Sequence, residues 1–217
     1  MNRTDVLNHL AEKYQLKRYL EIGLQNPQQN FDKIKCEYKI SVDPDPNAHA
    51  SFCMTSDKFF SLTNDDLHDY GWASLFKVHG KKDHYWSQFD LVFIDGMHTA
   101  EQVQKDFENA LKVLAPNGFI VLHDCNPEKE EHTIVPRPTK SGHWNGDVYR
   151  FALTITSKVF STDPAFTVDL DNGITIFSGH QEYRLHGFPL PYMEWEDFDA
   201  HRKELLNLIT WDEFVQL

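Results

Sequence analysis

Two acidic residues and two histidines, placed just after unbroken apolar segments, are the strongest candidates for chemistry in this sequence. They are Asp95, His98, His123 and Asp124. An imidazole near its working pKa can remove a proton from a substrate hydroxyl, and carboxylate oxygens can hold a divalent cation. Either histidine alone is more often a satisfied core residue. Its combination with the two carboxylates favours a site.

The elements that must position these residues are a strand, a helix and a second strand between Phe89 and Pro127. The runs Leu91–Ile94 and Phe119–Leu122 are continuously apolar, as parallel strands covered on both faces are. Polar residues follow each run, at the strand ends where open α/β sheets bind their ligands. The segment therefore predicts a site at one edge of a parallel sheet.

The helix between these strands is signalled at both ends. Thr99 is a typical N-cap, and Gln102 three residues later predicts a capping box. One apolar face follows at helical spacing, made of Val103, Phe107, Ala110, Leu111 and Leu114. The bend 116–118, Pro-Asn-Gly, should end the helix. Because such crossovers are right-handed, Asp95 and Asp124 should emerge from neighbouring strands at the same edge, where they could share a ligand.

The rest of the chain shows the same alternation of helices and strands, without internal repeats. We expect four helices: one at 4–14, one that begins with Ser56 or Asp57 as its N-cap, one at 147–160 capped by Asn145 or Asp147, and one at 199–208. Strands are expected at 18–23, 38–42 and 50–54. A hairpin is expected at 165–177, with its turn at Asn172-Gly173. Residues 64–87 show no regular spacing of apolar residues. Residues 128–146, with a turn at 141–142, form a long irregular segment of the kind that often serves as a lid. The chain therefore predicts one α/β domain over 1–178, with an aromatic, partly helical extension over 179–217.

Composition restricts the kind of partner. The 217 residues are 41% hydrophobic and carry a formal net charge of −12, which argues against nucleic acid or an anionic membrane and favours a small molecule or sugar. Cys36, Cys53 and Cys125 lack metal or disulfide spacing, and no segment resembles a signal peptide or membrane span, so we expect a cytoplasmic protein. The region of Trp195 and Trp211 is a candidate interface for a homo-oligomer.

Several of these features together resemble a known family. Glu21-x-Gly23 after a strand, Asp43 after the next, the strand 89–95, the bend 116–118 and the closing hairpin are similar to class I S-adenosylmethionine-dependent methyltransferases. Within that class, Ile94-Asp-Gly-x-His98 and Leu122-His-Asp124 resemble small-molecule O-methyltransferases, a subgroup with macrolide-sugar methyltransferases and cephalosporin-hydroxylase-like proteins. The resemblance covers 17–178 and implies a Rossmann-like, doubly wound, mostly parallel sheet.

The resemblance also implies roles in binding S-adenosylmethionine. The loop from Glu21 to Gly23 would lie against the methionine part, and Asp43 would accept hydrogen bonds from the ribose hydroxyls. Residues bordering the adenine would be Met54, Ser56 and Asp57. Asp95 would face the sulfonium. The residues themselves leave other readings open: Gly23 as a tight turn, Asp43 as the start of an Asx turn before Pro44, and Asp57 as an N-cap.

The expected reaction is methyl transfer to a hydroxyl oxygen of a small molecule or sugar. His98, His123 or Asp124 would act as base, or Asp95 and Asp124 would hold Mg²⁺, with Cys125 and Asn126 next in the chain.

The segment from Trp144 to Asp147 would close over the acceptor, or simply lead into a capped helix. Two other classes stay open: a metal-dependent hydrolase or oxygenase built on the Asp/His cluster, and a non-catalytic Rossmann-like module that docks through its aromatic tail.

Overall fold

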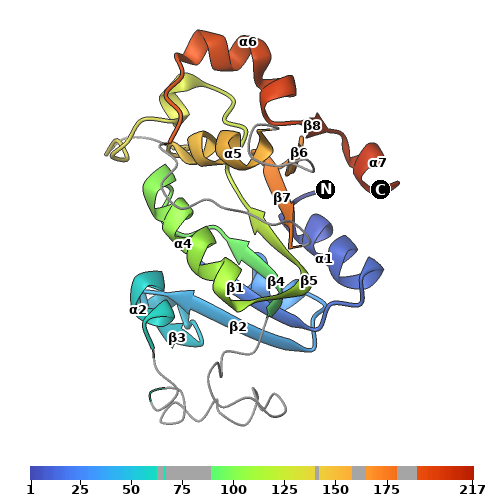
Figure 1. Ribbon diagram of the computed structural model, residues 1–217. Coiled ribbons are helices and arrows are strands. Elements are labelled where there is room, and N and C mark those ends of the chain that lie inside the picture. The colour runs from blue at the N-terminus through green and yellow to red at the C-terminus, as the bar shows by residue number, and fades with distance from the viewer. Residues whose placement is uncertain (63–65, 67–88, 140–141, 158–164, 180–189) are drawn as a thin grey trace.

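A mixed sheet with helices on both faces organises the computed structural model (Figure 1), which describes residues 1–62, 66, 89–139, 142–157, 165–179 and 190–217. Within these residues the sheet has eight strands in the order β3-β2-β1-β4-β5-β7-β6-β8. The strands are β1 Arg18–Ile22, β2 Tyr38–Asp43, β3 Phe52–Cys53, β4 Phe89–Ile94, β5 Leu114–Leu122, β6 Phe166–Val168, β7 Ile174–Ser178 and β8 Leu208–Ile209.

Helices and short 3₁₀ turns connect the strands. The helices are α1 Arg3–Lys13, α2 Ser56–Phe60, α4 Ala100–Val113, α5 Val148–Thr156, α6 Trp195–Leu205 and α7 Trp211–Phe214; the 3₁₀ turns are η1 Phe31–Lys33, η2 Pro46–Ala48 and η4 Glu130–His132. Among the described helices, none has both the length and the apolar character needed to cross a lipid bilayer.

The register of the parallel strands brings their carboxyl ends to one level. Ile22 at the end of β1 pairs with Val42 of β2 and Ile94 of β4, and Ile94 pairs with Leu122 of β5. β7 runs antiparallel to β5 and to β6. The predicted mostly parallel sheet with a closing hairpin is therefore confirmed, and residues that follow these strands meet at a single edge.

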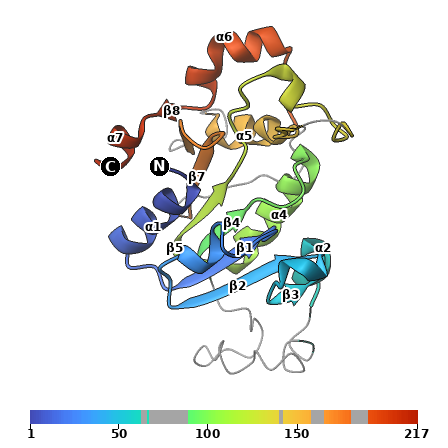
Figure 2. The ribbon, with the colours of Figure 1, turned by 180° about the vertical axis from the view of Figure 1, so that it is seen from behind.

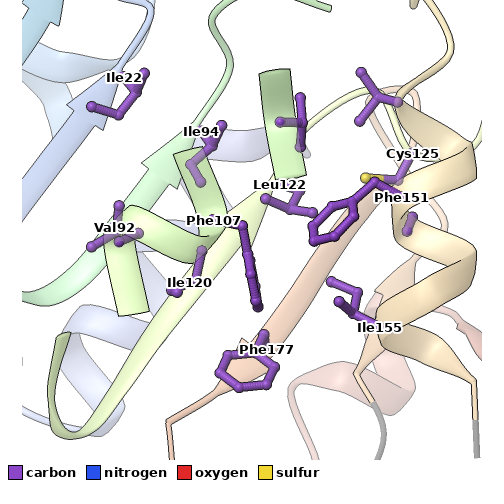
Figure 3. Close-up of a cluster of buried hydrophobic side chains, with 14 of the residues drawn as sticks. Ile22, Val92, Ile94, Phe107, Ile120, Leu122, Cys125, Phe151, Ile155 and Phe177 are labelled. Carbon is purple, nitrogen blue, oxygen red and sulfur yellow. The ribbon is translucent and has the colours of Figure 1, made fainter. Parts of the chain in front are cut away.

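Alternating side chains of the strands fill two cores, one on each face of the sheet. On the face covered by α4 and α5, the Phe107 ring lies 5.2 Å from that of Phe151 and 5.1 Å from that of Phe177, both edge to face (Figure 3). All three side chains are fully buried, and burial of each contributes roughly 1.5–3 kcal/mol. The opposite face is covered by α1, as the view from behind shows (Figure 2), with Leu7 and Leu10 in the second core.

The caps of α2 and α5 differ from expectation, and so does the capping box expected for α4. Thr55, rather than Ser56 or Asp57, caps α2, because its hydroxyl accepts from the backbone N–H of Lys58. Thr99 caps α4 as predicted, but Gln102 does not complete the capping box: its side-chain amide donates to other residues across the cavity wall.

Asp147 occupies the N-cap position of α5 without capping it. Its Oδ1 instead accepts from the backbone N–H of Ala100, 2.7 Å away, and so caps α4, while its Oδ2 pairs with Arg150 at 3.0 Å. Asn145 lies before that position, and its side chain binds Asp124. Neither predicted cap of α5 is therefore correct, because tertiary partners compete for both side chains.

The C-terminal segment joins the sheet rather than lying apart from it. β8 pairs in parallel with β6, and Phe198 of α6 is fully buried in the first core. Trp195 packs against Phe198 with ring centroids 5.5 Å apart, and Trp211 packs against Phe214 at 5.7 Å. Both tryptophans thus have partners within the chain.

Element boundaries also moved. β5 starts at Leu114, so the bend 116–118 lies inside the strand instead of before it, and α6 begins at Trp195, earlier than the predicted 199. Apart from Asp66, the expectations for 64–87 lie outside the described residues, as do those for the turn residue 141 and for the helical segment 158–160.

Gly23 gives a direct test of how β1 and β4 meet at the sheet edge. Its φ is +85°, and a Cβ there would lie 2.2 Å from the carbonyl oxygen of Asp95. Gly23→Ala should therefore lower the free energy of unfolding by about 2–4 kcal/mol in chemical denaturation. Gly96→Ala is the matched control, because a Cβ there meets its nearest atom at 3.5 Å and should cost less than about 1 kcal/mol. Equal effects of the two variants would contradict this account.

Candidate active site

A cavity of about 1070 Å³ opens at the carboxyl ends of the parallel strands. Its wall comes from the loops after β1, β2, β4 and β5, from the start of α1 and from the turn between β6 and β7. All the predicted site residues line it except Met54 and Asp147. The cavity is large enough for a nucleoside-sized ligand together with a small second molecule.

One end of the cavity holds the predicted carboxylate and histidine cluster. His98 lies between two acids, with Nε2 3.3 Å from Asp95 Oδ1 and Nδ1 3.0 Å from Asp124 Oδ2. His123 Nδ1 is 3.3 Å from both Asp95 Oδ1 and Asp124 Oδ2, within ion-pair distance although off the hydrogen-bonding direction. The structure therefore brings together all four residues that the two strand ends supply.

Mutual pairing shifts the pKa values in this cluster. Burial alone would lower the pKa of His123, but Asp95, Asp124 and Asp171 outweigh it and raise that pKa well above its ordinary value. Burial also opposes the charged form of His98, yet Asp95 and Asp124 raise its pKa. For Asp95, burial would raise the pKa, but His123, His98 and Arg3 hold it well below its usual range. The carboxylates thus favour the charged form of both imidazoles.

Sequence reasoning missed three residues of this cluster. Arg3, the first residue of α1, donates from Nη1 to Asp95 Oδ2 and from Nε to Asp171 Oδ2 at 3.0 Å. Asn145 donates from Nδ2 to Asp124 Oδ1 at 2.6 Å. Asp171 lies in the hairpin turn, and because β7 is antiparallel to β5 this turn must lie at the active edge of the sheet. That topological signal was available in the sequence for Asp171, but nothing comparable pointed to Arg3 or Asn145.

A second part of the cavity wall holds a buried polar chain behind the loop after β1. Tyr19 OH donates to Glu21 Oε2 at 2.6 Å, and Asn30 Nδ2 donates to the same oxygen at 3.0 Å. Asn30 in turn accepts from the Thr4 hydroxyl at 2.8 Å. Burial raises the pKa of Glu21 to about 8 despite the two donors, so the carboxyl carries its proton through much of the neutral range.

Asp43 supports the loop after β1. Its Oδ2 accepts from the backbone N–H groups of Leu24 and Gln25, each at 2.9 Å, and its Oδ1 accepts from Asp45 N at 2.8 Å. The last of these is the Asx turn considered from sequence. A carboxylate has about four acceptor positions, so one position on Oδ1 is left for a ligand in the cavity.

Met54 takes a position different from the one the resemblance implied, whereas Gly23 does not. Gly23 lines the cavity, but its missing side chain makes room for the backbone of Asp95 and Gly96. Met54 packs against the first hydrophobic core and does not line the cavity. Ser56 and Asp57 do line it, and both accept from the amide of Gln102, at 3.3 and 3.1 Å.

Trp144 lines the cavity but already has ring partners. Its indole stacks on His98, with centroids 5.3 Å apart and planes 14° apart, and its Nε1 donates to the carbonyl of Ile134 at 2.8 Å. The guanidinium of Arg137 lies 5.3 Å from the same ring. Trp144 is therefore a fixed support for His98, whereas Asp147, predicted with it as a substrate contact, does not line the cavity and caps α4.

The predicted Mg²⁺ site does not fit these residues. Asp95, His98 and Asp124 do place donor atoms within 4.8 Å of one another, but two oxygens and a nitrogen suit a transition metal better than magnesium. Asn126, the nearest extra oxygen ligand in the chain, accepts instead from Arg202 at 2.8 Å. Arg3 and His123 surround the Asp95 carboxylate. The positively charged partners of Asp95 are therefore side chains of the protein, Arg3 and His123.

Residues 28–125 match the family model described as a methyltransferase domain. Similar solved structures include the O-methyltransferase TomG from Streptomyces achromogenes in complex with S-adenosylmethionine, which is 16% identical, has a TM-score of 0.45, and is matched over 80% of this chain and 78% of that chain. No curated protein sequence matches the chain.

Two further similar structures differ in the atom they methylate. An O-methyltransferase from Bacillus cereus in complex with S-adenosylhomocysteine is 15% identical with a TM-score of 0.44, over 81% of this chain and 80% of that one. The N-methyltransferase NodS from Bradyrhizobium japonicum is 14% identical with a TM-score of 0.42, over 81% and 92%.

Residues 28–125 thus match a methyltransferase domain, and the cavity lies at the carboxyl ends of the parallel strands within and beside the matched segment. Neither a metal-dependent hydrolase or oxygenase nor a non-catalytic module finds support in the comparisons.

The buried Glu21 should make stability depend on pH. Its pKa is raised from 4.5 to about 8 in the fold, so the folded state holds the proton more tightly than the unfolded chain does. As pH rises from about 4.5 through about 8, the free energy of unfolding of wild type should fall relative to Glu21→Gln, by on the order of 2 kcal/mol. Urea denaturation of both proteins across this range checks it, with Glu12→Gln on exposed α1 surface as control. A constant difference would contradict the assignment.

Proposed function

We propose that this enzyme transfers a methyl group from S-adenosylmethionine to a hydroxyl oxygen of a small molecule, with sugars and phenols as candidate acceptors. The observation that carries this proposal is the single cavity that joins the Glu21 and Asp43 end to the His98 and Asp124 end. The first end offers acceptors suited to a nucleoside and an amino acid group. The second offers groups that take a proton. One cavity thus provides for both a donor and an acceptor.

The donor end fits S-adenosylmethionine through the chemistry of its side chains. Asp43 retains one acceptor position for a ribose hydroxyl, next to loop backbone that it holds in place. Glu21 lines the cavity beside that loop, where a carboxyl can meet the amino group of the methionine part. Ser56 and Asp57, fixed by Gln102, border the place expected for the adenine. When bound, S-adenosylmethionine supplies an electrophilic methyl group on a sulfonium.

At the acceptor end, His98 is the best-placed base. Its side chain is 22% exposed, whereas that of His123 is 3% exposed, so His98 is the imidazole that a substrate hydroxyl can reach. Asp124 lies 3.0 Å from His98 Nδ1 and stabilises the imidazolium formed when the hydroxyl proton arrives. The indole of Trp144 stacks on the His98 imidazole and fixes its orientation. Positioning and proton removal are the two kinds of assistance that an in-line displacement at carbon needs.

The proposal extends to the setting of the enzyme. The net charge of −12 disfavours polyanionic acceptors, and a small neutral hydroxyl compound suits the cavity. All three cysteines are free thiols, two of them buried, which suits the reducing cytoplasm expected from the sequence.

The donor site is tested by calorimetry with S-adenosylhomocysteine. Wild type should bind, and Asp43→Ala should bind roughly 10–100-fold more weakly, because it loses a charged hydrogen bond and the support of the loop. Asp90→Ala is the matched control: Asp90 Oδ2 likewise accepts from two consecutive backbone N–H groups, of Lys17 and Arg18, but far from the cavity. No heat with wild type would refute the donor assignment, and equal loss in both variants would refute the role of Asp43.

The role of His98 can be tested without knowing the acceptor. Because its pKa is raised by Asp95 and Asp124, the imidazole should titrate above 6.5 in NMR, and Asp124→Asn should lower that pKa. Activity with an accepted hydroxyl compound should then rise with pH through this pKa, and His98→Gln should reduce kcat roughly 10²–10³-fold. Asp199→Asn, on the exposed face of α6, is the control and should leave the titration of His98 unchanged. A titration unaffected by Asp124→Asn would contradict the proposed pair.

A further inference from the structure

Arg3 is the feature of the site that neither the domain match nor the resemblance accounts for. It opens α1, and its backbone is fixed there because Asn2 and Asp5 form a capping box around it. The Asn2 side chain accepts from Thr4 N at 3.0 Å, and Asp5 accepts from Asn2 N at 2.8 Å. Arg3 lines the cavity, and its side chain is 29% exposed. The helix cap thus delivers one guanidinium to a defined place.

The guanidinium bridges two carboxylates from distant parts of the chain. Nη1 donates to Asp95 Oδ2, while Nε donates to Asp171 Oδ2 at 3.0 Å and Nη2 to Asp171 Oδ1 at 3.4 Å. The backbone N–H of Arg3 adds a bond of 2.9 Å to Asp171 Oδ2. Arg3 therefore joins the end of β4 to the turn of the β6–β7 hairpin, in the planar two-oxygen geometry that guanidinium groups favour.

The other oxygen of Asp95 is also engaged. Both His98 Nε2 and His123 Nδ1 lie 3.3 Å from Asp95 Oδ1. The cluster thus sets three carboxylates, of Asp95, Asp124 and Asp171, against one guanidinium and two imidazoles. A divalent ion on Asp95 would meet the fixed positive charge of Arg3, and like charges at such distances repel strongly in a partly buried site.

We propose that Arg3 is the resident cation of this active site, a positioning residue that binds Asp95 and Asp171 and takes the place of the divalent ion expected on Asp95. Arg3 and Asp171 both lie outside the matched residues 28–125, so the flanking segments add this cation to the shared domain. The inference rests on the proposed function only in treating this cluster as the active site of a methyltransferase. What is inferred is that Arg3 and a metal ion compete for the carboxylate of Asp95.

The test measures Mn²⁺ binding by electron paramagnetic resonance in full-length variants. Wild type should bind Mn²⁺ weakly, and Arg3→Met should bind it at least tenfold more tightly, because Asp95 Oδ2 is released beside His98 and Asp124. Arg3→Lys, which keeps a charge, should stay near wild type. Adding Asp95→Asn to Arg3→Met should remove the gain. Binding of S-adenosylhomocysteine by wild type should be the same with and without a chelator.

Arg18→Met is the matched control, because Arg18 pairs with Asp90 at 2.7 Å and also opens its element, but at the opposite end of the strands. It should show no gain in Mn²⁺ binding. The inference is overturned if wild type binds Mn²⁺ as tightly as Arg3→Met, or if a folded Arg3→Met shows no gain. Calorimetry with S-adenosylhomocysteine on wild type separates this from failure of the proposed function, since that measurement concerns the donor site alone.

Discussion

The need to pair one partly buried carboxylate, Asp95, determines much of what surrounds the active edge of this sheet. A buried charge without partners costs several kcal/mol, so groups must converge on it from wherever the chain can supply them. Here they come from the start of α1, from the loop after β4 and from the end of β5. The partners of these groups extend the network: Asp171 fixes Arg3, and Asn145 fixes Asp124.

The same requirement explains why segments outside the matched domain belong to the active site. α1 covers the second core with its apolar face, but its first turn also reaches over the sheet edge with Arg3. The hairpin turn is held against the end of β5 by backbone bonds from Cys125 N to Gly173 O and from Asn126 N to Asn172 O. Asp171 in that turn adopts a left-handed conformation, with φ of 46°. Packing and charge pairing thus position the same elements.

The two ends of the cavity use polar groups in different ways. At the donor end Asp43 uses most of its hydrogen-bonding capacity to hold the backbone of the loop after β1. At the acceptor end the side chains bind mainly to one another, which orients His98 before any substrate arrives. Preorganisation of this kind is what an enzyme gains from a rigid scaffold under a reactive site.

The sequence by itself determined the strands, the direction of the crossover and therefore the meeting of Asp95, His98, His123 and Asp124. These follow from local periodicity and from the handedness of connections, which need no knowledge of distant contacts. Only the tertiary structure decided the partners of those residues. Arg3 reaches Asp95 across 92 positions and Asp147 caps α4 rather than its own helix, because a side chain takes the strongest partner that folding brings near, whatever its place in the sequence.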